Sequence, residues 1–210
     1  MSVHEMVSTV FEFTGGNLCL DFANTLGGAR GSGTREHLLT YHDLVSWSLQ
    51  AGIITADQAA LLQSETGREP GEAEVVLARA HKLREAIYGL FSSLTRGDQP
   101  DGSDLFTLNT ELGWALVGGH LIAHPDGFTW QWPAEQQGFS RMLSSLARSA
   151  ATLLTAPECQ FVRECASPTC NWLFLDNTKN HRRRWCSPTG CGNLAKVRRH
   201  RQRRREQERG

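Results

Sequence analysis

Two pairs of cysteines near the C-terminal end constrain this chain more than any other feature. Cys165 and Cys170 bracket Ala-Ser-Pro-Thr, and 15 residues later Cys186 and Cys191 bracket Ser-Pro-Thr-Gly. Loops of this length, separated by a gap of this length, are typical of zinc-binding pairs. A Ser-Pro turn reverses the chain tightly enough to aim two thiolates at one ion while backbone N–H groups face the sulfurs. The spacing therefore predicts one structural zinc ion with four cysteine ligands.

A structural zinc site is a better prediction for the four sulfurs than disulfides, a catalytic zinc or a redox centre. In a reducing compartment, clustered cysteines are more often metal ligands than disulfides. Four thiolates fill a tetrahedral zinc site and leave no position for a water molecule, which argues against a catalytic zinc. Two disulfides, a redox centre or an iron–sulfur cluster remain as alternatives.

The sequence around the cysteines predicts a small zinc-finger domain at residues 161–206. Residues 171–176 alternate as a strand, and residues 183–185 can return antiparallel to it after a turn. A helix is expected to begin at Cys191, which gives a treble-clef-like order of loop, hairpin, loop and basic helix. A lobe of ~45 residues has too small a core to fold alone, so we expect it to be unfolded without metal.

The charge distribution points to a polyanionic partner. Residues 1–178 hold 10 Lys and Arg against 20 Asp and Glu, whereas residues 179–210 hold 12 against 2. Basic side chains placed against phosphates release condensed counterions, so a basic segment of this kind favours nucleic acid. A solvated tail without a function is the alternative. The candidate nucleic-acid contacts are Arg182, Arg183, Arg184, Lys196, Arg198, Arg199, Arg201 and Arg203.

The preceding residues predict a mainly helical α+β domain over residues 1–157, which ends at Ala156-Pro157. Apolar residues at helical spacing indicate a series of helices, and a Pro-Asp-Gly turn indicates one β-hairpin. The glycine-rich segment 27–36 is expected to be a mobile loop. The expected helices cover residues 18–26, 42–50, 55–63, 72–96, 105–112 and 139–154, and the hairpin strands cover 121–124 and 128–132.

A group of polar residues interrupts the first apolar stripe. Asp21, Asn24 and Thr25 stand at i, i+3 and i+4, so a helix would gather them on one face, with Arg30 just beyond. We favour a hydrogen-bonded structural cluster, because tertiary hydrogen bonds use these residue types. A small-molecule pocket is the alternative.

Several function classes lack support in the sequence. It holds no P-loop, GxSxG or HExxH motif, and the spacing of its histidines makes no metal site, so we predict that the protein is not an enzyme. The first 13 residues do not resemble a signal peptide, and no apolar run approaches the ~18 residues of a membrane span. A cytoplasmic protein without membrane attachment is therefore expected.

Residues 162–203 resemble the CGNR zinc finger, through W-L-F-x-D, R-R-W-C and C-G-N before a basic helix. Residues 15–30 are similar to the LDF-x-NT-x4-R signature of the ABATE domain, which usually precedes that finger. The resemblance implies a bacterial, stress-related transcription regulator with a DNA-binding finger. Leu194 departs from it, since the family has Arg there. If that Arg contacts phosphate, its role is lost or passes to Lys196 or Arg198.

Three functional hypotheses follow from the sequence. The first is a DNA-binding transcription regulator, whose N-terminal domain senses a ligand or mediates association into a homodimer. The second is an RNA-binding or ribosome-associated module, because Arg-rich segments that fold on RNA look the same in sequence. The third makes the finger a protein-interaction module that the acidic domain masks.

Overall fold

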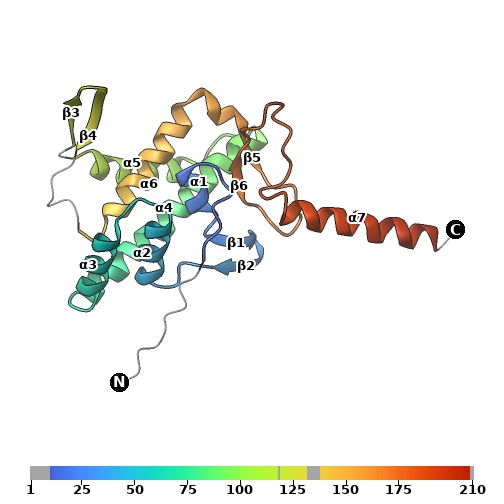
Figure 1. The fold of residues 1–210 in the computed structure, drawn as a ribbon, viewed down its shortest axis with the longest axis horizontal. Helices are drawn as coiled ribbons and strands as arrows, with labels where there is room; N and C mark the ends of the chain where they lie inside the picture. The colour runs from blue at the N-terminus through green and yellow to red at the C-terminus, as the bar shows by residue number, and fades with distance from the viewer. Residues whose placement is uncertain (1–9, 118, 132–137, 209–210) are drawn as a thin grey trace, which may run out of the picture.

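The protein is described by a computed structural model that covers residues 10–117, 119–131 and 138–208, and it is mainly helical with three small β-hairpins (Figure 1). The predicted α+β class is confirmed. The helices are α1 (Leu18–Ala23), α2 (Tyr41–Gln50), α3 (Ala56–Thr66), α4 (Pro70–Arg96), α5 (Gly102–Leu116), α6 (Arg141–Thr155), the 3-10 helix η2 (Pro157–Phe161) and α7 (Cys191–Gln207). The antiparallel strand pairs are β1 (Leu26–Ala29) with β2 (Ser32–Glu36), β3 (His120–His124) with β4 (Gly127–Gln131), and β5 (Val162–Glu164) with β6 (Leu173–Leu175).

Helix α4 runs through the middle of the molecule (Figure 1). Helices α1, α2, α3, α5 and α6 and strands β5 and β6 contact it. Pro70 opens it, where a missing N–H costs nothing, and Gly97 ends it in the left-handed conformation at φ 73°. Its predicted stripe is buried at Val76, Ala80, Leu83, Ile87 and Leu90, whereas Leu94 is 42% exposed. This helix therefore forms the centre of the core.

The helices predicted at residues 42–50 and 55–63 are confirmed as α2 and α3, which pack against each other. Thr40 and Thr55 each cap the N-terminus of a helix in a capping box, with Asp43 and Gln58 as the third-position partners. Helix α6 is also confirmed. Of its predicted stripe, Phe139, Met142, Leu143, Leu146, Ala150 and Leu153 are buried and Leu154 is partly buried.

The glycine-rich segment is a β-hairpin, so its prediction as a mobile loop was wrong. Gly28 has a φ of +82° at an irregular register position, and a Cβ there would collide with the Gly33 carbonyl. The glycines that suggested a loop are therefore what permits the turn and its bulge. The hairpin docks on α4 through a bidentate ion pair between Glu36 and Arg84, both bonds being 2.6 Å long.

The predicted hairpin around Pro-Asp-Gly is confirmed as β3 and β4, with Leu121 opposite Trp130. Trp132, which we had placed at its end, lies outside the described residues. This hairpin projects from the body next to α5 (Figure 1).

The first part of the zinc finger is built into the main core. Val162, Leu173 and Leu175 are buried together with residues of α1, α4 and α6. The predicted pairing of residues 171–176 with residues 183–185 was wrong, since β6 pairs with β5 upstream of the first cysteine. Cys165 and Cys170 therefore lie in the loop that joins β5 to β6, and residues 183–185 form no strand.

Candidate metal centre and nucleic-acid interface

The four predicted cysteines converge on one point. Their Sγ atoms all lie within 4.8 Å of one another, at 3.8 Å for Cys170 to Cys186 and 3.7 Å for Cys186 to Cys191. A tetrahedron with Zn–S bonds of ~2.3 Å has S–S edges of ~3.8 Å, while a disulfide bond is ~2.05 Å long. No disulfide joins these thiols. The cluster is thus the site of one structural zinc ion, and within the described ranges it is the only such group of potential ligands.

Backbone N–H groups support the sulfurs, as the turn sequence predicted. The N–H groups of Cys186 and Ser167 bond the sulfur of Cys165, and that of Trp172 bonds the sulfur of Cys170. Hydrogen bonds from the thiols of Cys170 and Cys186 lower the pKa of Cys165. The same contacts with Cys165 raise the pKa of Cys170 and Cys186, so the thiols share their protons, and zinc would have to displace these protons on binding.

Strand β6 separates the metal centre from the main core. Because side chains alternate along a strand, Leu173 and Leu175 point into the main core while Phe174 packs against the cysteines on the other face. Trp172 and Trp185 pack beside Phe174. The tryptophans therefore belong to the core of the finger.

Asp176 orders the loop between the two cysteine pairs, a role that the sequence analysis missed. It is buried, and its carboxylate accepts from the Thr178 N–H and hydroxyl and from the Arg183 N–H. Burial opposes its ionisation, but these hydrogen bonds prevail and lower its pKa. The acidic residue that ends the motif W-L-F-x-D was the sequence signal that could have identified Asp176.

The side chain of Arg183 bonds groups within the protein. Its guanidinium donates to the carbonyls of Thr14, Trp185 and Cys186 and lies 4.4 Å over the ring of Phe174. The geometry therefore does not support the prediction that Arg183 contacts nucleic acid. Arg182 and Arg184 are exposed, and Arg184 stacks 5.3 Å from the Trp185 ring.

Helix α7 starts at the fourth zinc ligand and extends away from the body (Figure 1). Gly192 is buried against Trp185, and every residue from 196 to 208 except Val197 has a polar or ionised side chain. All residues of that range are exposed. The predicted contacts Lys196, Arg198, Arg199, Arg201 and Arg203 thus share one helix, together with Arg204 and Arg205. Leu194 is 53% exposed in its first turn.

The polar side chains of the N-terminal signature make hydrogen bonds within the protein. Helix α1 ends at Ala23, so the predicted single helical face is not formed. Asp21 accepts the Gly15 N–H at 2.7 Å, and burial raises the pKa of Asp21 to about 6. The Thr25 hydroxyl donates to the Phe22 carbonyl. Arg30 bonds Glu85 and the Ala23 carbonyl and stacks over Tyr88.

Asn24 joins this cluster to the finger. Its side chain donates to the Leu173 carbonyl and accepts the Leu173 N–H. Two backbone hydrogen bonds run alongside, from Leu175 N to the Gly15 carbonyl and from Asp176 N to the Phe161 carbonyl. The N-terminal signature thus holds the edge of the finger's strand.

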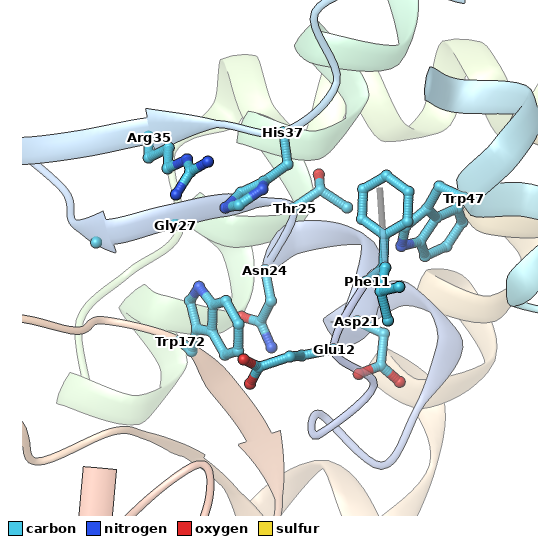
Figure 2. A pocket seen from close by; sticks show the side chains of 12 residues that line it. Phe11, Glu12, Asp21, Asn24, Thr25, Gly27, Arg35, His37, Trp47 and Trp172 are labelled. Carbon is cyan, nitrogen blue, oxygen red and sulfur yellow. The ribbon is translucent and has the colours of Figure 1, made fainter. Parts of the chain in front are cut away.

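A cavity of about 240 Å³ lies between the N-terminal segment, the β1–β2 hairpin and the finger (Figure 2). Asp21, Asn24 and Thr25 line it, but Arg30 does not. Sequence reasoning missed its other side chains, because they come from distant segments with no shared motif. These are Phe11, Glu12, Arg35, His37, Trp47 and Trp172.

Comparison with family models agrees with this arrangement. Residues 16–157 match the ABATE family, whose description is "Putative stress-induced transcription regulator". The chain belongs to the ABATE family. Residues 162–204 match the CGNR zinc finger, so both resemblances found in the sequence are confirmed. A comparison with curated proteins gives no match. Within the described ranges, no helix combines the length and the apolarity needed to cross a bilayer.

Proposed function

We propose that this ABATE protein is a transcription regulator that binds DNA through α7, while its N-terminal domain senses a ligand or mediates association into a homodimer. The observation that carries the proposal is the position of α7. The helix begins at the zinc ligand Cys191 and presents seven Lys and Arg side chains before its one acid, Glu206. The role is one of binding and not of catalysis, and the reducing cytoplasm is the compartment in which the cysteines stay free for zinc.

Charge repulsion within α7 supports a phosphate partner. Arg199 and Arg203 stand at i and i+4, where like charges destabilise an isolated helix. The ion pair from Arg204 to Glu208 offsets little of this, because both side chains are exposed. Phosphates would neutralise the repulsion and add charge-assisted hydrogen bonds. The helix therefore gains most of its stability when it lies against a nucleic acid.

Duplex DNA is favoured over RNA by the helical form of the basic segment. A rigid helix fixed at one end fits the major groove of B-form DNA, whereas the deep major groove of A-form RNA excludes side chains. RNA binding remains the second candidate, because phosphate contacts alone do not distinguish the two.

Competition between the two nucleic acids tests the proposal. The full-length, zinc-loaded protein is bound to a labelled duplex DNA and challenged with equal masses of unlabelled duplex DNA and of structured RNA. We expect DNA to compete better and chelation of zinc to weaken binding, since α7 then loses its fixed start. Stronger competition by RNA would favour the RNA-binding function over the DNA-binding function. Absence of binding to DNA and to RNA would refute both functions.

The masking hypothesis has a separate test. To mask α7, acidic side chains of the N-terminal domain would have to form ion pairs with its basic side chains. Within the described residues, the ion pair found on α7 joins Arg204 to Glu208, and both belong to the C-terminal segment. Reversal of two acidic surface charges, at Glu69 just before α4 and at Glu74 on α4, should therefore leave the affinity for DNA unchanged. A large rise in affinity would instead support masking.

A further inference from the structure

We propose that the cavity between the ABATE signature and the finger binds a small zwitterion with a flat apolar body, which is the chemistry of an aromatic amino acid. This inference deepens the sensing role of the N-terminal domain and rests on that part of the proposed function. The site is built from segments far apart in the sequence, with Glu12 before α1, Arg35 on β2 and Trp172 before β6.

The size and walls of the cavity select the apolar part of the ligand. A volume of about 240 Å³ is below the ~300–1,000 Å³ of pockets for drug-sized molecules, so the occupant is small. Phe11, Trp47 and Trp172 supply aromatic walls (Figure 2). Flat apolar groups pack well against such rings, in stacked or edge-to-face contact.

The polar and charged side chains of the cavity determine which charged groups the ligand should carry. Arg35 and His37 lie on one side of the cavity, and the carboxylates of Glu12 and Asp21 lie on the other (Figure 2). Asp21 is held by Gly15, but the side chains of Glu12, Arg35 and His37 make no hydrogen bond or ion pair within the described parts of the chain. A carboxylate on the ligand would pair with Arg35 and could accept a hydrogen bond from the imidazole of His37, whose pKa is lowered by burial. An ammonium group would pair with Glu12.

A ligand with only one charge fits less well. A simple carboxylate would leave Glu12 facing it across the cavity, and a simple amine would leave Arg35 unpaired. Glu12 and Arg35 are exposed and keep contact with water, so a ligand that lacks the opposite charge loses one favourable ion pair with the site. The remaining wall residues Asn24 and Thr25 already have partners inside the protein, so they shape the cavity and do not add a further charge.

Two short connections link the cavity to the metal centre. The indole N–H of Trp172 donates to the Leu26 carbonyl, while its backbone carbonyl accepts the N–H of the zinc ligand Cys165. On the other side, the segment with Phe11 and Glu12 continues to Thr14, whose carbonyl accepts from Arg183, and Arg183 also holds the Cys186 carbonyl. An occupant that moves either wall therefore moves a loop that carries a zinc ligand.

Calorimetric titration of the full-length, zinc-loaded protein tests the site. The probes are L-phenylalanine, 3-phenylpropionate, which lacks the ammonium group, and phenethylamine, which lacks the carboxylate. We expect one L-phenylalanine per chain, with each analogue weaker by about tenfold or more. The absence of binding at concentrations up to about 10 mM, or equal affinities for all three probes, would overturn the proposal.

Two variants identify the pairing. Arg35→Ala should weaken L-phenylalanine and 3-phenylpropionate by about tenfold and leave phenethylamine unchanged, whereas Glu12→Gln should weaken L-phenylalanine and phenethylamine and leave 3-phenylpropionate unchanged. Arg68→Ala and Glu74→Gln, at exposed positions away from the cavity, are the matched controls. Binding that neither cavity variant alters would place the amino acid elsewhere and refute the site.

The same protein measured on DNA separates this inference from the proposed function. If L-phenylalanine binds and changes the affinity for duplex DNA, both stand. If it binds but DNA does not, the site stands and the DNA-binding proposal fails. If DNA binds and L-phenylalanine does not, the site fails alone.

Discussion

The side chain of Asn24 pairs with the backbone of Leu173 in both directions. Its Nδ2 donates to the Leu173 carbonyl at 2.8 Å, and its Oδ1 accepts the Leu173 N–H at 2.9 Å. Both groups are buried. An asparagine of the ABATE signature thus takes the place of a neighbouring strand at the edge of β6, and the finger becomes part of the main fold.

Loss of this pair should destabilise the whole protein. Asn24→Ala leaves two buried backbone groups without partners, each costing ~1–3 kcal/mol, so we expect the free energy of unfolding to fall by about 2–6 kcal/mol. Urea denaturation monitored by far-UV circular dichroism measures it. Asn109→Ala, on the exposed face of α5, is the control. A loss below about 0.5 kcal/mol would mean that the pair does not hold the finger to the body.

Thiol labelling should distinguish the metal ligands from the other cysteines. In the zinc-loaded protein we expect Cys159 to react first, because it is half-buried, whereas Cys19 is fully buried and burial raises its pKa to about 12. The four ligands should react only after chelation. Cys165→Ser should lose the zinc, and Cys159→Ser should keep one equivalent. Rapid labelling of Cys165 or Cys191 before chelation would contradict the zinc site.

Asp21 predicts a pH dependence of stability. Burial raises its pKa to about 6, against ~3.9 in an unfolded chain. Between these values the folded protein holds a proton that the unfolded chain has lost, so the contribution of Asp21 to stability falls as the pH rises from about 4 to about 6. Asp21→Asn removes this contribution, and its stability relative to the wild type should rise over that interval.

Urea denaturation at a series of pH values measures this difference. Glu74→Gln, at an exposed position, is the control and should run parallel to the wild type. A difference between Asp21→Asn and the wild type that does not vary between pH 4 and 6 would show that Asp21 is ionised throughout.

Leu194 is the position at which this chain departs from the CGNR motif. The side chain is 53% exposed in the first turn of α7, so an arginine fits there without displacing core residues. If α7 lies on DNA, Leu194→Arg should raise the affinity and steepen the logarithmic salt slope by about 0.9, the value of one added phosphate contact. Leu194→Gln should do neither. Equal effects of the two variants would place this turn away from the phosphates.

Local signals predicted the helices and the zinc ligands well, because their causes lie within a few residues. Thr40 and Thr55 carry their own capping boxes, and the cysteine loops carry their own turns. The β1–β2 hairpin was missed because Thr34 is its one β-branched residue, and because its glycines permit the turn and the bulge. The ion pair that anchors it joins Glu36 to Arg84, which no local pattern reveals.

The finger hairpin was mispaired for a related reason. Residues 171–176 alternate correctly, but their partner strand at Val162–Glu164 precedes the first cysteine. Residues 183–185 are the better candidate for the partner strand only if the finger is assumed to fold separately from the N-terminal domain. The pairing of Asn24 with Leu173, 149 residues away, makes that assumption fail. The cavity escaped prediction likewise, since tertiary packing alone brings Glu12, Arg35 and Trp172 together.

The dependence of DNA affinity on salt concentration shows whether α7 lies on the phosphates of DNA. Fluorescence anisotropy of the full-length, zinc-loaded protein on a labelled duplex gives the affinity over a range of salt concentrations. With ~6 phosphates neutralised, we predict a logarithmic slope of about −5, which Arg198→Gln with Arg199→Gln makes shallower by about 2. Arg68→Gln should leave it unchanged. Absence of salt-dependent binding, or a slope that the α7 substitutions do not alter, would contradict the account.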